Sequence, residues 1–456
     1  MQLNRRRHLS LAALALIGGT GAHAQSERPE PALPAQWDSG LLWYQEDANR
    51  IRDLEAIVSV RQPLSEDKAW NGKLTVDTVC GGSPIGAIPS KSAQSFVTPT
   101  ATSLNPPVPV VTQTTTSASG GGGGGGGLDN LSLCTDPVQN QKYTIAPGAL
   151  PIDQSFHDQR VAINGGFDTA VGPRSHVAVG GAISHETDFF SLSVNGLLTH
   201  DYNDRNTTAA LGVNLEADRI SPVGGTPVAG SLYGDFQKTG DQSKKVEDLL
   251  LGVTQVVSRR WITQVNGSLE HAGGYQTDPY KIVTEVDAQG YDAAGIYRYE
   301  SRPQSRNRYA LYWDNKYAFD RDMLEASLRL TRDTWGIRSG TVELRYRLNL
   351  GDMGYFEPHL RGYRQTAADF FRFYLPQGAP FTGYASTDPR LGGFTGETFG
   401  VKYGLPVGET GELSFRVERY SQHATDSSSA LAGLQGLDLS PGLHALIVQA
   451  GLRFMF

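Results

Sequence analysis

Alternation of apolar and polar residues constrains this chain most, and it is clearest in the last fourteen residues, LHALIVQAGLRFMF. One face of this segment carries Leu446, Val448, Ala450, Leu452, Phe454 and Phe456, and the other carries Ile447, Gln449, Gly451, Arg453 and Met455. A period of two indicates a β-strand with one apolar and one mostly polar face. In a soluble sandwich the apolar face would meet a second sheet. In an outer-membrane barrel it would meet lipid, and the polar face would line the lumen.

The same alternation recurs along the chain and predicts an all-β fold, a transmembrane outer-membrane β-barrel of about 16 antiparallel strands. The expected strands are residues 37–47, 53–62, 70–79, 157–169, 175–184, 189–201, 206–219, 247–257, 260–270, 306–318, 323–331, 340–350, 354–365, 393–404, 411–420 and 443–456.

The expected connections separate by length. Those after the even-numbered strands are short, whereas the five long ones follow strands three, seven, nine, thirteen and fifteen. All long loops therefore fall at one end and all tight turns at the other. Bacterial outer-membrane barrels have this asymmetry, with short periplasmic turns and long external loops.

Composition agrees with this class. Charged residues are 19 %, hydrophobic residues 39 % and glycines 53 of 456, which suits a many-stranded β protein. The formal charge is −7 and there is no basic stripe, which argues against nucleic acid as a partner. Beyond the N-terminus no run of eighteen apolar residues occurs, so a transmembrane helix is not expected.

The N-terminus has the three parts of an export signal. A basic start (Arg5, Arg6 and Arg7) precedes the apolar LSLAALALIGG, and Ala22-His23-Ala24 provides a small-x-small cleavage site. We therefore expect a signal peptide over 1–24, cleaved near Ala24, then a periplasmic lead over 25–36 and a single barrel domain over 37–456. The expected location is the outer membrane of a Gram-negative bacterium.

Residues 83–155 interrupt the strand pattern with Ser, Thr, Pro and a run of eight glycines at 120–127. Such a composition buries little apolar surface, so we expect a disordered external insertion. The two cysteines, Cys80 and Cys134, lie near its ends. Because export leads to an oxidising compartment, a disulfide between them is favoured over two free thiols.

Twelve ionisable residues on the last hairpins are expected to point into the lumen, and we call this set the lumen charge ladder. Its members are Glu325, Arg329, Glu343, Arg345, Arg347, Glu357, His359, Arg361, Lys402, Glu412, Arg416 and Glu418. Opposite charges on adjacent strands should pair across the sheet. The ladder would act either as a charge filter for small polar solutes or ions, or as a salt-bridge mesh that braces the wall.

Aromatic residues are expected at the membrane interfaces. Six tryptophans lie near predicted turns or rims: Trp37, Trp43, Trp70, Trp261, Trp313 and Trp335. A run at 370–374, with Phe370, Phe371, Phe373 and Tyr374, begins an external loop. It would form part of such a girdle or a contact patch.

Catalysis is not expected. The chain has no Gly-x-Ser-x-Gly elbow, no His-x-x-x-His or Cys-x-x-Cys spacing, and no phosphate-binding glycine loop with its Lys-Ser/Thr. His359 would in principle serve a hydrolase at the rim, but it is better explained as the lumen partner of a carboxylate. No cofactor or metal is therefore predicted.

Six phrases of the sequence are similar to blocks of one bacterial family. They are YQEDANRI (44–51), SHETDFFSLSVNG (184–196), NDRNTT (203–208), GYQTDPYK (274–281), DTWGIRSGT (333–341) and RGYRQTAADFF (361–371). They resemble the uncharacterised exported family known as domain of unknown function 3570. The resemblance implies an outer-membrane β-barrel and supplies no reaction or substrate. The glycine tract and the phrase around Cys80 depart from the family pattern.

The sequence thus predicts a porin-like channel that passes small hydrophilic solutes through a charged lumen. A barrel scaffold that holds a small lipoprotein or redox partner for assembly or surface export is the alternative, and an outer-membrane hydrolase is a third. Expected partners are outer-membrane lipid and the barrel-insertion machinery. Recognition by that machinery of a terminal strand ending in Phe456 is implied by the barrel class.

Overall fold

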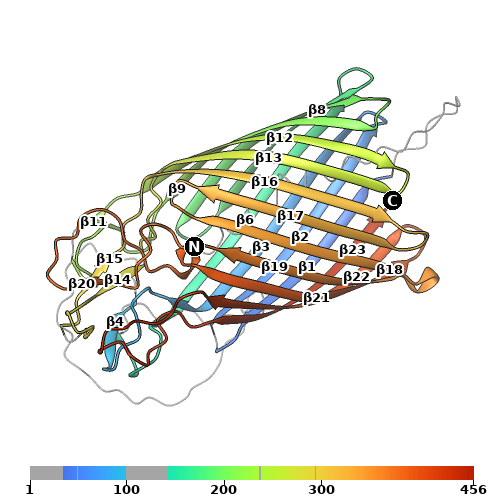
Figure 1. Ribbon diagram of the computed structural model, residues 1–456. Coiled ribbons are helices and arrows are strands. Elements are labelled where there is room, and N and C mark those ends of the chain that lie inside the picture. The colour runs from blue at the N-terminus through green and yellow to red at the C-terminus, as the bar shows by residue number, and fades with distance from the viewer. Residues whose placement is uncertain (1–33, 49, 99–141, 236–237, 293) are drawn as a thin grey trace, which may run out of the picture.

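Sixteen antiparallel strands close into a barrel in this computed structural model, which describes residues 34–48, 50–98, 142–235, 238–292 and 294–456 (Figure 1). In ring order the strands are β1 (Gln36–Glu46), β2 (Ile51–Ser65), β3 (Lys68–Pro84), β6 (Ile152–Ala170), β7 (Ser175–His185), β8 (Phe189–Tyr202), β9 (Thr207–Ile220), β12 (Gln242–Ser258), β13 (Trp261–Gly274), β16 (Ser305–Ala318), β17 (Met323–Asp333), β18 (Arg338–Asn349), β19 (Tyr355–Gln365), β21 (Phe394–Val407), β22 (Gly411–Ala424) and β23 (Leu443–Met455).

All sixteen strands predicted from the alternation are present, so the all-β barrel prediction is confirmed. The C-terminal strand closes the ring. β23 pairs with β22 and also with β1, where Gln36 lies opposite Met455. One step further, the amide of Ala35 donates to the carbonyl oxygen of Phe456 at 2.7 Å. The apolar alternation of the tail is therefore the seam of a closed sheet with no free edge.

The long loops gather at one end of the barrel, as the sequence predicted, and only short turns join the strands at the other end (Figure 1). The prediction that every tight turn lies at that other end was wrong, because the short connections 47–50, 186–188 and 334–337 lie at the same end as the long loops. The turn between β8 and β9 places Asn203, Asp204 and Arg205 at positive φ angles of 49°, 52° and 67°. Asn and Asp tolerate this left-handed backbone better than most residues, which suits a tight reversal. We call the two ends the short-turn end and the long-loop end.

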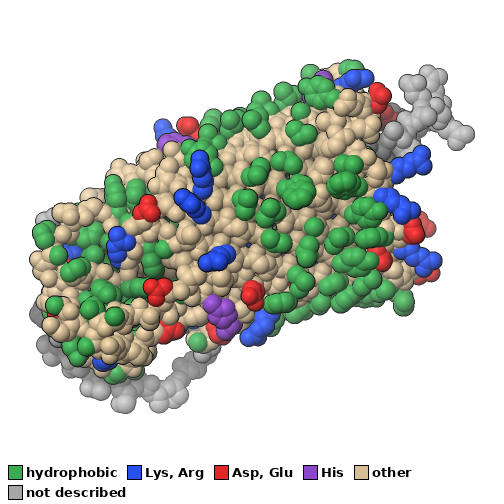
Figure 2. Space-filling view, in the orientation of Figure 1, with side chains coloured by type: hydrophobic (Ala, Val, Ile, Leu, Met, Phe, Trp, Pro, Cys, Tyr) green, Lys and Arg blue, Asp and Glu red, His purple; other side chains and the backbone are tan. Residues whose placement is uncertain are grey.

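The outer surface of the barrel is apolar. Val194 is 54 % exposed and Leu192 is 47 % exposed, although both lie within β8. Figure 2 shows hydrophobic side chains gathered over the barrel strands, with many charged side chains at the two ends. A broad apolar band on a closed barrel is the surface that a bilayer covers. Within the described ranges, none of the helices is long and apolar enough to cross a membrane.

Not every predicted rim aromatic faces outward. Trp37, Trp70, Trp261 and Trp313 are between 37 % and 46 % exposed, and Trp43 is half-buried. Trp335 is a correction. It is only 4 % exposed, because its ring packs against Phe370 at the long-loop end with centroids 5.1 Å apart.

The long loops fold together into a structured layer, which we call the loop cap: residues 85–98, 142–151, 275–304, 366–393 and 425–442. It contains a three-stranded sheet of β15 (Tyr297–Tyr299), β14 (Ile282–Val286) and β20 (Tyr374–Pro376), and a pair of β4 (Gln94–Val97) with β5 (Lys142–Ile145). All five residues of β14 are buried. The smaller pair β10 (Thr226–Pro227) and β11 (Lys238–Thr239) lies in the loop after β9.

The loop cap spans the mouth of the barrel. One cluster joins Ala87 and Phe96, from the loop after β3, to Ile282 and Tyr297, from the loop after β13. β3 and β13 are six places apart in a ring of sixteen strands, in which directly opposite strands are eight apart, so their loops start far apart on the rim. Their contact therefore extends over the opening. Figure 1 shows these elements beyond the ends of the barrel strands.

The prediction of a disordered insertion over 83–155 was wrong for its two ends. Residues 85–98 and 142–151 are ordered because their scattered apolar side chains find partners in other loops, as when Phe96 buries its ring against Tyr297 at 5.1 Å. The run at 370–374 is likewise part of the cap interior instead of a girdle. Phe370 is buried beside Leu391, and Tyr374 packs near Leu434.

Three sequence predictions fall outside the described residues. These are the signal peptide over 1–24, most of the lead over 25–36, and the glycine-rich centre of the insertion with Cys134. Cys80 lies in β3 and is buried, with 5 % of its surface exposed. Its pairing with Cys134 stays a prediction.

Candidate functional site

The strand period places the lumen charge ladder on the inner wall. On β17 the residues Glu325, Ser327 and Arg329 share one face, while Leu328 and Leu330 share the other. Leu330 is 46 % exposed on the outer surface. Antiparallel pairing then aligns the inward faces of neighbouring strands, so that charges from β17, β18, β19, β21 and β22 meet around part of the lumen.

Ten of the twelve ladder residues are joined by ion pairs. Arg345 contacts both Glu325, at 3.4 Å, and Glu343. Arg347 lies 2.8 Å from Glu357, and Arg416 lies 3.9 Å from the same carboxylate. The remaining pairs are Arg416–Glu418 at 3.2 Å and Lys402–Glu412 at 3.6 Å. The structure therefore brings most of the predicted set into one continuous mesh.

His359 is the centre of this mesh. Its Nδ1 lies 2.8 Å from Oε1 of Glu418, and its Nε2 lies 3.1 Å from Oε1 of Glu343. The imidazole thus connects β19 to β22 on one side and to β18 on the other. Both ring nitrogens are engaged by carboxylates, so neither is left to activate a nucleophile in this arrangement.

Arg329 and Arg361 complete the predicted set but lie against aromatic rings instead. The guanidinium carbon of Arg329 is 4.9 Å from the ring centroid of Tyr312, and that of Arg361 is 5.9 Å from the centroid of Tyr363. Cation–π contacts at these distances hold a guanidinium without neutralising its charge.

The wall opposite the mesh is different in character. In the ring order β7 lies opposite β19, and this side of the lumen pairs small residues with amides. Asn195 of β8 lies over Gly180 of β7, so that a Cβ added at Gly180 would be 3.0 Å from Oδ1 of Asn195. Asn266 covers Gly252 in the same way, at 2.4 Å. Around Gly180 and Gly252 the inner wall therefore presents amides and bare backbone in place of charged side chains.

Sequence reasoning missed a second group of lumen ion pairs near the long-loop end. Arg160 of β6 lies 2.6 Å from Asp77 and 3.3 Å from Glu55. Lys244 lies 2.9 Å from Asp218. Further pairs are Arg308–Glu270, at 3.0 Å, and Arg306–Asp333. The sequence does contain the signal for these pairs, because the same period of two places their residues on inward faces. The prediction of lumen charges covered only the last hairpins.

A buried network of charges fastens the loop cap. Arg302 lies 2.9 Å from Asp388, and Arg390 lies 3.0 Å from Asp278 and also contacts Asp388. The backbone amide of Asp278 donates to Glu300 at 2.6 Å. These contacts tie the loop after β13 to the loop after β19. We call the five residues the cap latch.

The latch carboxylates respond to burial and to the arginines in opposite ways. Burial acts to raise the pKa of Asp388, but Arg390 and Arg302 more than offset it and hold that pKa below its usual range. Lys281, Arg390 and Arg302 do the same for the pKa of Asp278, again against burial. For Glu300 burial dominates and raises the pKa. A latch with ionised aspartates is therefore favoured at neutral pH.

Three further carboxylates meet at the long-loop end of β6, β7 and β8. Asp158, Glu186 and Asp188 are buried, with oxygen atoms within 4.8 Å of one another. Oxygen ligands of this kind suit a hard cation such as Ca²⁺ or Mg²⁺. Asp188 also accepts a hydrogen bond from the Tyr280 hydroxyl at 2.9 Å. An acidic cluster alone is no evidence for a metal, and we assign none.

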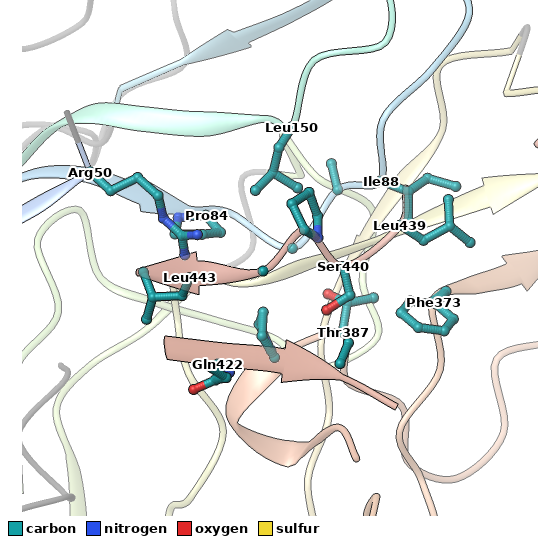
Figure 3. A pocket seen from close by; sticks show the side chains of 16 residues that line it. Arg50, Pro84, Ile88, Leu150, Phe373, Thr387, Gln422, Leu439, Ser440 and Leu443 are labelled. Atoms are coloured by element: carbon teal, nitrogen blue, oxygen red, sulfur yellow. The ribbon is translucent and has the colours of Figure 1, made fainter. Parts of the chain in front are cut away.

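A small cavity lies where the cap meets the barrel rim. It has a volume of about 50 Å³. Figure 3 shows Arg50 and Pro84 of the rim facing Leu150, Ile88 and Leu439 of the cap around it. This volume holds at most one or two water molecules. The junction between the cap and the rim is therefore closely packed.

A family comparison identifies the chain. The family model described as Protein of unknown function (DUF3570) matches residues 6–454. The chain belongs to this family. The match covers nearly the whole sequence and confirms the resemblance drawn from the six phrases. No curated protein is significantly similar to this DUF3570 chain.

Solved structures similar to the DUF3570 chain are outer-membrane proteins. OccK5 (OpdH) of Pseudomonas aeruginosa is 7 % identical, with a TM-score of 0.40 over 93 % of this chain and 98 % of that one. A bacterial polysaccharide outer membrane secretin is 9 % identical, with a TM-score of 0.41 over 94 % and 100 %. The chain spans only 54 % of the length of the ferric enterobactin receptor PfeA, at 11 % identity and a TM-score of 0.39. Similarity at this level concerns the fold alone.

Proposed function

We propose that this protein is a porin-like channel of the outer membrane, which passes small hydrophilic solutes along a charged lumen. The carrying observation is the two-sided wall: Val194 points outward and is 54 % exposed, while its neighbour Asn195 belongs to the polar inner face. A closed ring of sixteen strands is wide enough for an aqueous channel. A polar interior in such a ring has its simplest use in solute passage.

The loop cap gives this channel a gate. Since cap segments reach across the mouth and are joined by the cap latch, solute entry requires the cap to move. We expect mostly closed channels with rare openings. Export by the predicted signal peptide, its cleavage near Ala24 and insertion through the Phe456 strand belong to the same proposal.

Planar bilayers test the proposal directly. Purified wild-type protein should give discrete current steps at low open probability, and Asp388→Asn, which weakens the cap latch, should raise that probability. Asp438→Asn is the matched control, because Asp438 is an exposed cap carboxylate outside the latch. Complete silence of both the wild type and Asp388→Asn at all voltages would contradict a channel.

The folded cap also supports a second candidate, a scaffold that holds a small lipoprotein or redox partner. In that case the barrel would stay silent in bilayers and a small periplasmic protein would co-purify with it. We propose no enzymatic step, since Glu343 and Glu418 occupy both nitrogens of His359. Ester or lipid hydrolysis that is lost on His359→Ala would support the hydrolase alternative instead.

A further inference from the structure

Two cations of the lumen charge ladder differ from the others, because neither lies within ion-pair distance of a carboxylate. Among the residues that the structure describes, Arg329 and Arg361 form no ion pair, whereas Arg345, Arg347 and Arg416 each do. The nearest acidic neighbour in the register is Glu343, which lies opposite Arg361 on β18. Its carboxylate is already used by Arg345 and His359. The pair therefore contributes surplus positive charge to the inner wall.

The two arginines are also near each other. Arg329 lies opposite Thr341 of β18, and Thr341 lies opposite Tyr363, the residue against which Arg361 rests. β17 and β19 flank β18, so their axes are separated by two strand spacings, about 10 Å. Because arginine side chains are long, the two guanidinium groups can lie closer to each other than the strand axes do.

Their aromatic contacts hold the guanidinium groups in place. Tyr312 supports Arg329 at 4.9 Å and Tyr363 supports Arg361 at 5.9 Å, measured from the guanidinium carbon to the ring centroid. A ring contact uses the face of the guanidinium plane and leaves its N–H donors at the edge. The parity of β17 and β19 places both sets of donors on the inner face of the barrel.

We propose that Arg329 and Arg361 form an oxyanion-binding step in the lumen, so that the channel favours small solutes with a carboxylate or phosphate group. The guanidinium fork matches both groups and binds them with paired hydrogen bonds. An arginine pair that lies outside any ion pair also lowers the electrostatic barrier to anions and raises it to cations. This inference rests on the proposed channel function and names its solute class.

Reversal potentials measure the selectivity. In a potassium chloride gradient the reversal potential of the wild-type current should lie toward the chloride equilibrium potential. Arg329→Gln and Arg361→Gln should each shift it toward the potassium side, and the double variant further. Added potassium acetate or potassium phosphate should reduce the chloride current of the wild type. The anion that reduces the current more at equal concentration identifies the preferred group, carboxylate or phosphate. A conducting channel whose reversal potential is the same in the wild type and the double variant would overturn the inference and leave the channel intact.

Arg332→Gln is the matched control on the same strand. Arg332 also rests on a tyrosine, with its guanidinium carbon 5.3 Å from the ring centroid of Tyr309. It lies three residues after Arg329 on β17, an odd number, so its side chain is on the outer face of the strand. The Arg332→Gln substitution removes an equal charge and an equivalent ring contact without changing the lumen. It should therefore leave the reversal potential unchanged. A shift as large as that of Arg329→Gln would show that the effect is not a lumen effect.

A second measurement does not need conductance. Phenylglyoxal modifies accessible guanidinium groups, and mass spectrometry of the detergent-purified protein gives the rate at each arginine. Inorganic phosphate should slow modification of Arg329 and Arg361 severalfold and leave Arg332 unaffected. Equal rates with and without phosphate, at millimolar concentrations, would overturn the inference even if the barrel were silent in bilayers.

Discussion

At the scale of single residues, glycines allow large side chains to lie flat along the inner wall. A Cβ added at Gly404 of β21 would be 2.3 Å from the ring of Tyr355 on β19, and one at Gly400 would be 2.6 Å from Cγ of Glu418. Because these positions lack a side chain, Tyr355 can support the guanidinium of Arg347 at 4.0 Å. Lumen width and the ion-pair mesh thus depend on residues that carry no charge.

We expect Gly404→Ala to displace the Tyr355 ring and destabilise the barrel by about 1–3 kcal/mol, the usual cost of overpacking. Gly362→Ala on β19 is the control, since an added Cβ there meets no atom within 4 Å. It should be neutral or slightly stabilising, because alanine has less freedom in the unfolded chain. Guanidinium unfolding from lipid vesicles measures both. Equal stability of the two variants would show that the Tyr355 contact is not tight.

At the scale of elements, sequence reasoning succeeded for the barrel strands and failed for the loop cap. Each barrel strand separates lipid from lumen by itself, so its alternation appears in the local sequence. β14 reads IVTEV, and all five of its residues are buried by segments from distant loops. No local pattern reports such partners. The alternation of residues along each strand predicted which ladder residues face the lumen. It could not predict that Glu343 would bind His359 in place of Arg361, which lies directly opposite it, because that choice depends on side-chain geometry.

The cap latch predicts how the cap responds to acid. An aspartate has a pKa of about 3.9 when unfolded, and those of Asp278 and Asp388 are lower in the folded cap. Their contribution to stability is therefore complete above about pH 4 and is lost progressively as the pH falls from there toward their lower folded pKa values. Glu300 acts in the opposite direction, because burial raises its pKa and protonation removes a buried charge. We expect the two arginine-bound aspartates to dominate.

Spin labels report this loosening. A label at Tyr384→Cys, an exposed cap position, should become progressively more mobile as the pH falls below about 4, whereas one at Asp352→Cys in a short turn should not change. Adding Asp388→Asn to the cap label should mobilise it already at neutral pH, since breaking a buried charge pair costs about 3–5 kcal/mol. A cap label that stays immobile in both conditions would show that the apolar clusters alone hold the cap.

At the scale of the whole molecule, two kinds of apolar surface are kept apart. Inside the cap, Phe96, Ile282 and Val286 are about 1 % exposed and pack as in a soluble protein. On the barrel the apolar side chains lie on the exposed outer surface (Figure 2). Only the second kind needs a bilayer. The fold is therefore a water-facing lid on a lipid-facing cylinder, and the two should differ in what destabilises them.

Adjacent residues at mid-height of β8 test this division. Val194→Arg places a charge on the lipid-facing side and should cost about 2–4 kcal/mol of unfolding free energy in phospholipid vesicles. Asn195→Arg adds the same side chain one residue later, on the inner face. It should cost far less, because its guanidinium can remain in water. Urea titrations in vesicles of fixed thickness measure both, and the difference should widen as the bilayer thickens, since the outer charge then lies deeper in hydrocarbon. Equal costs for the two variants, or a wild-type protein that stays monodisperse without detergent, would mean that protein or water covers the outer face, and the orientation of all sixteen strands would have to be reversed or abandoned.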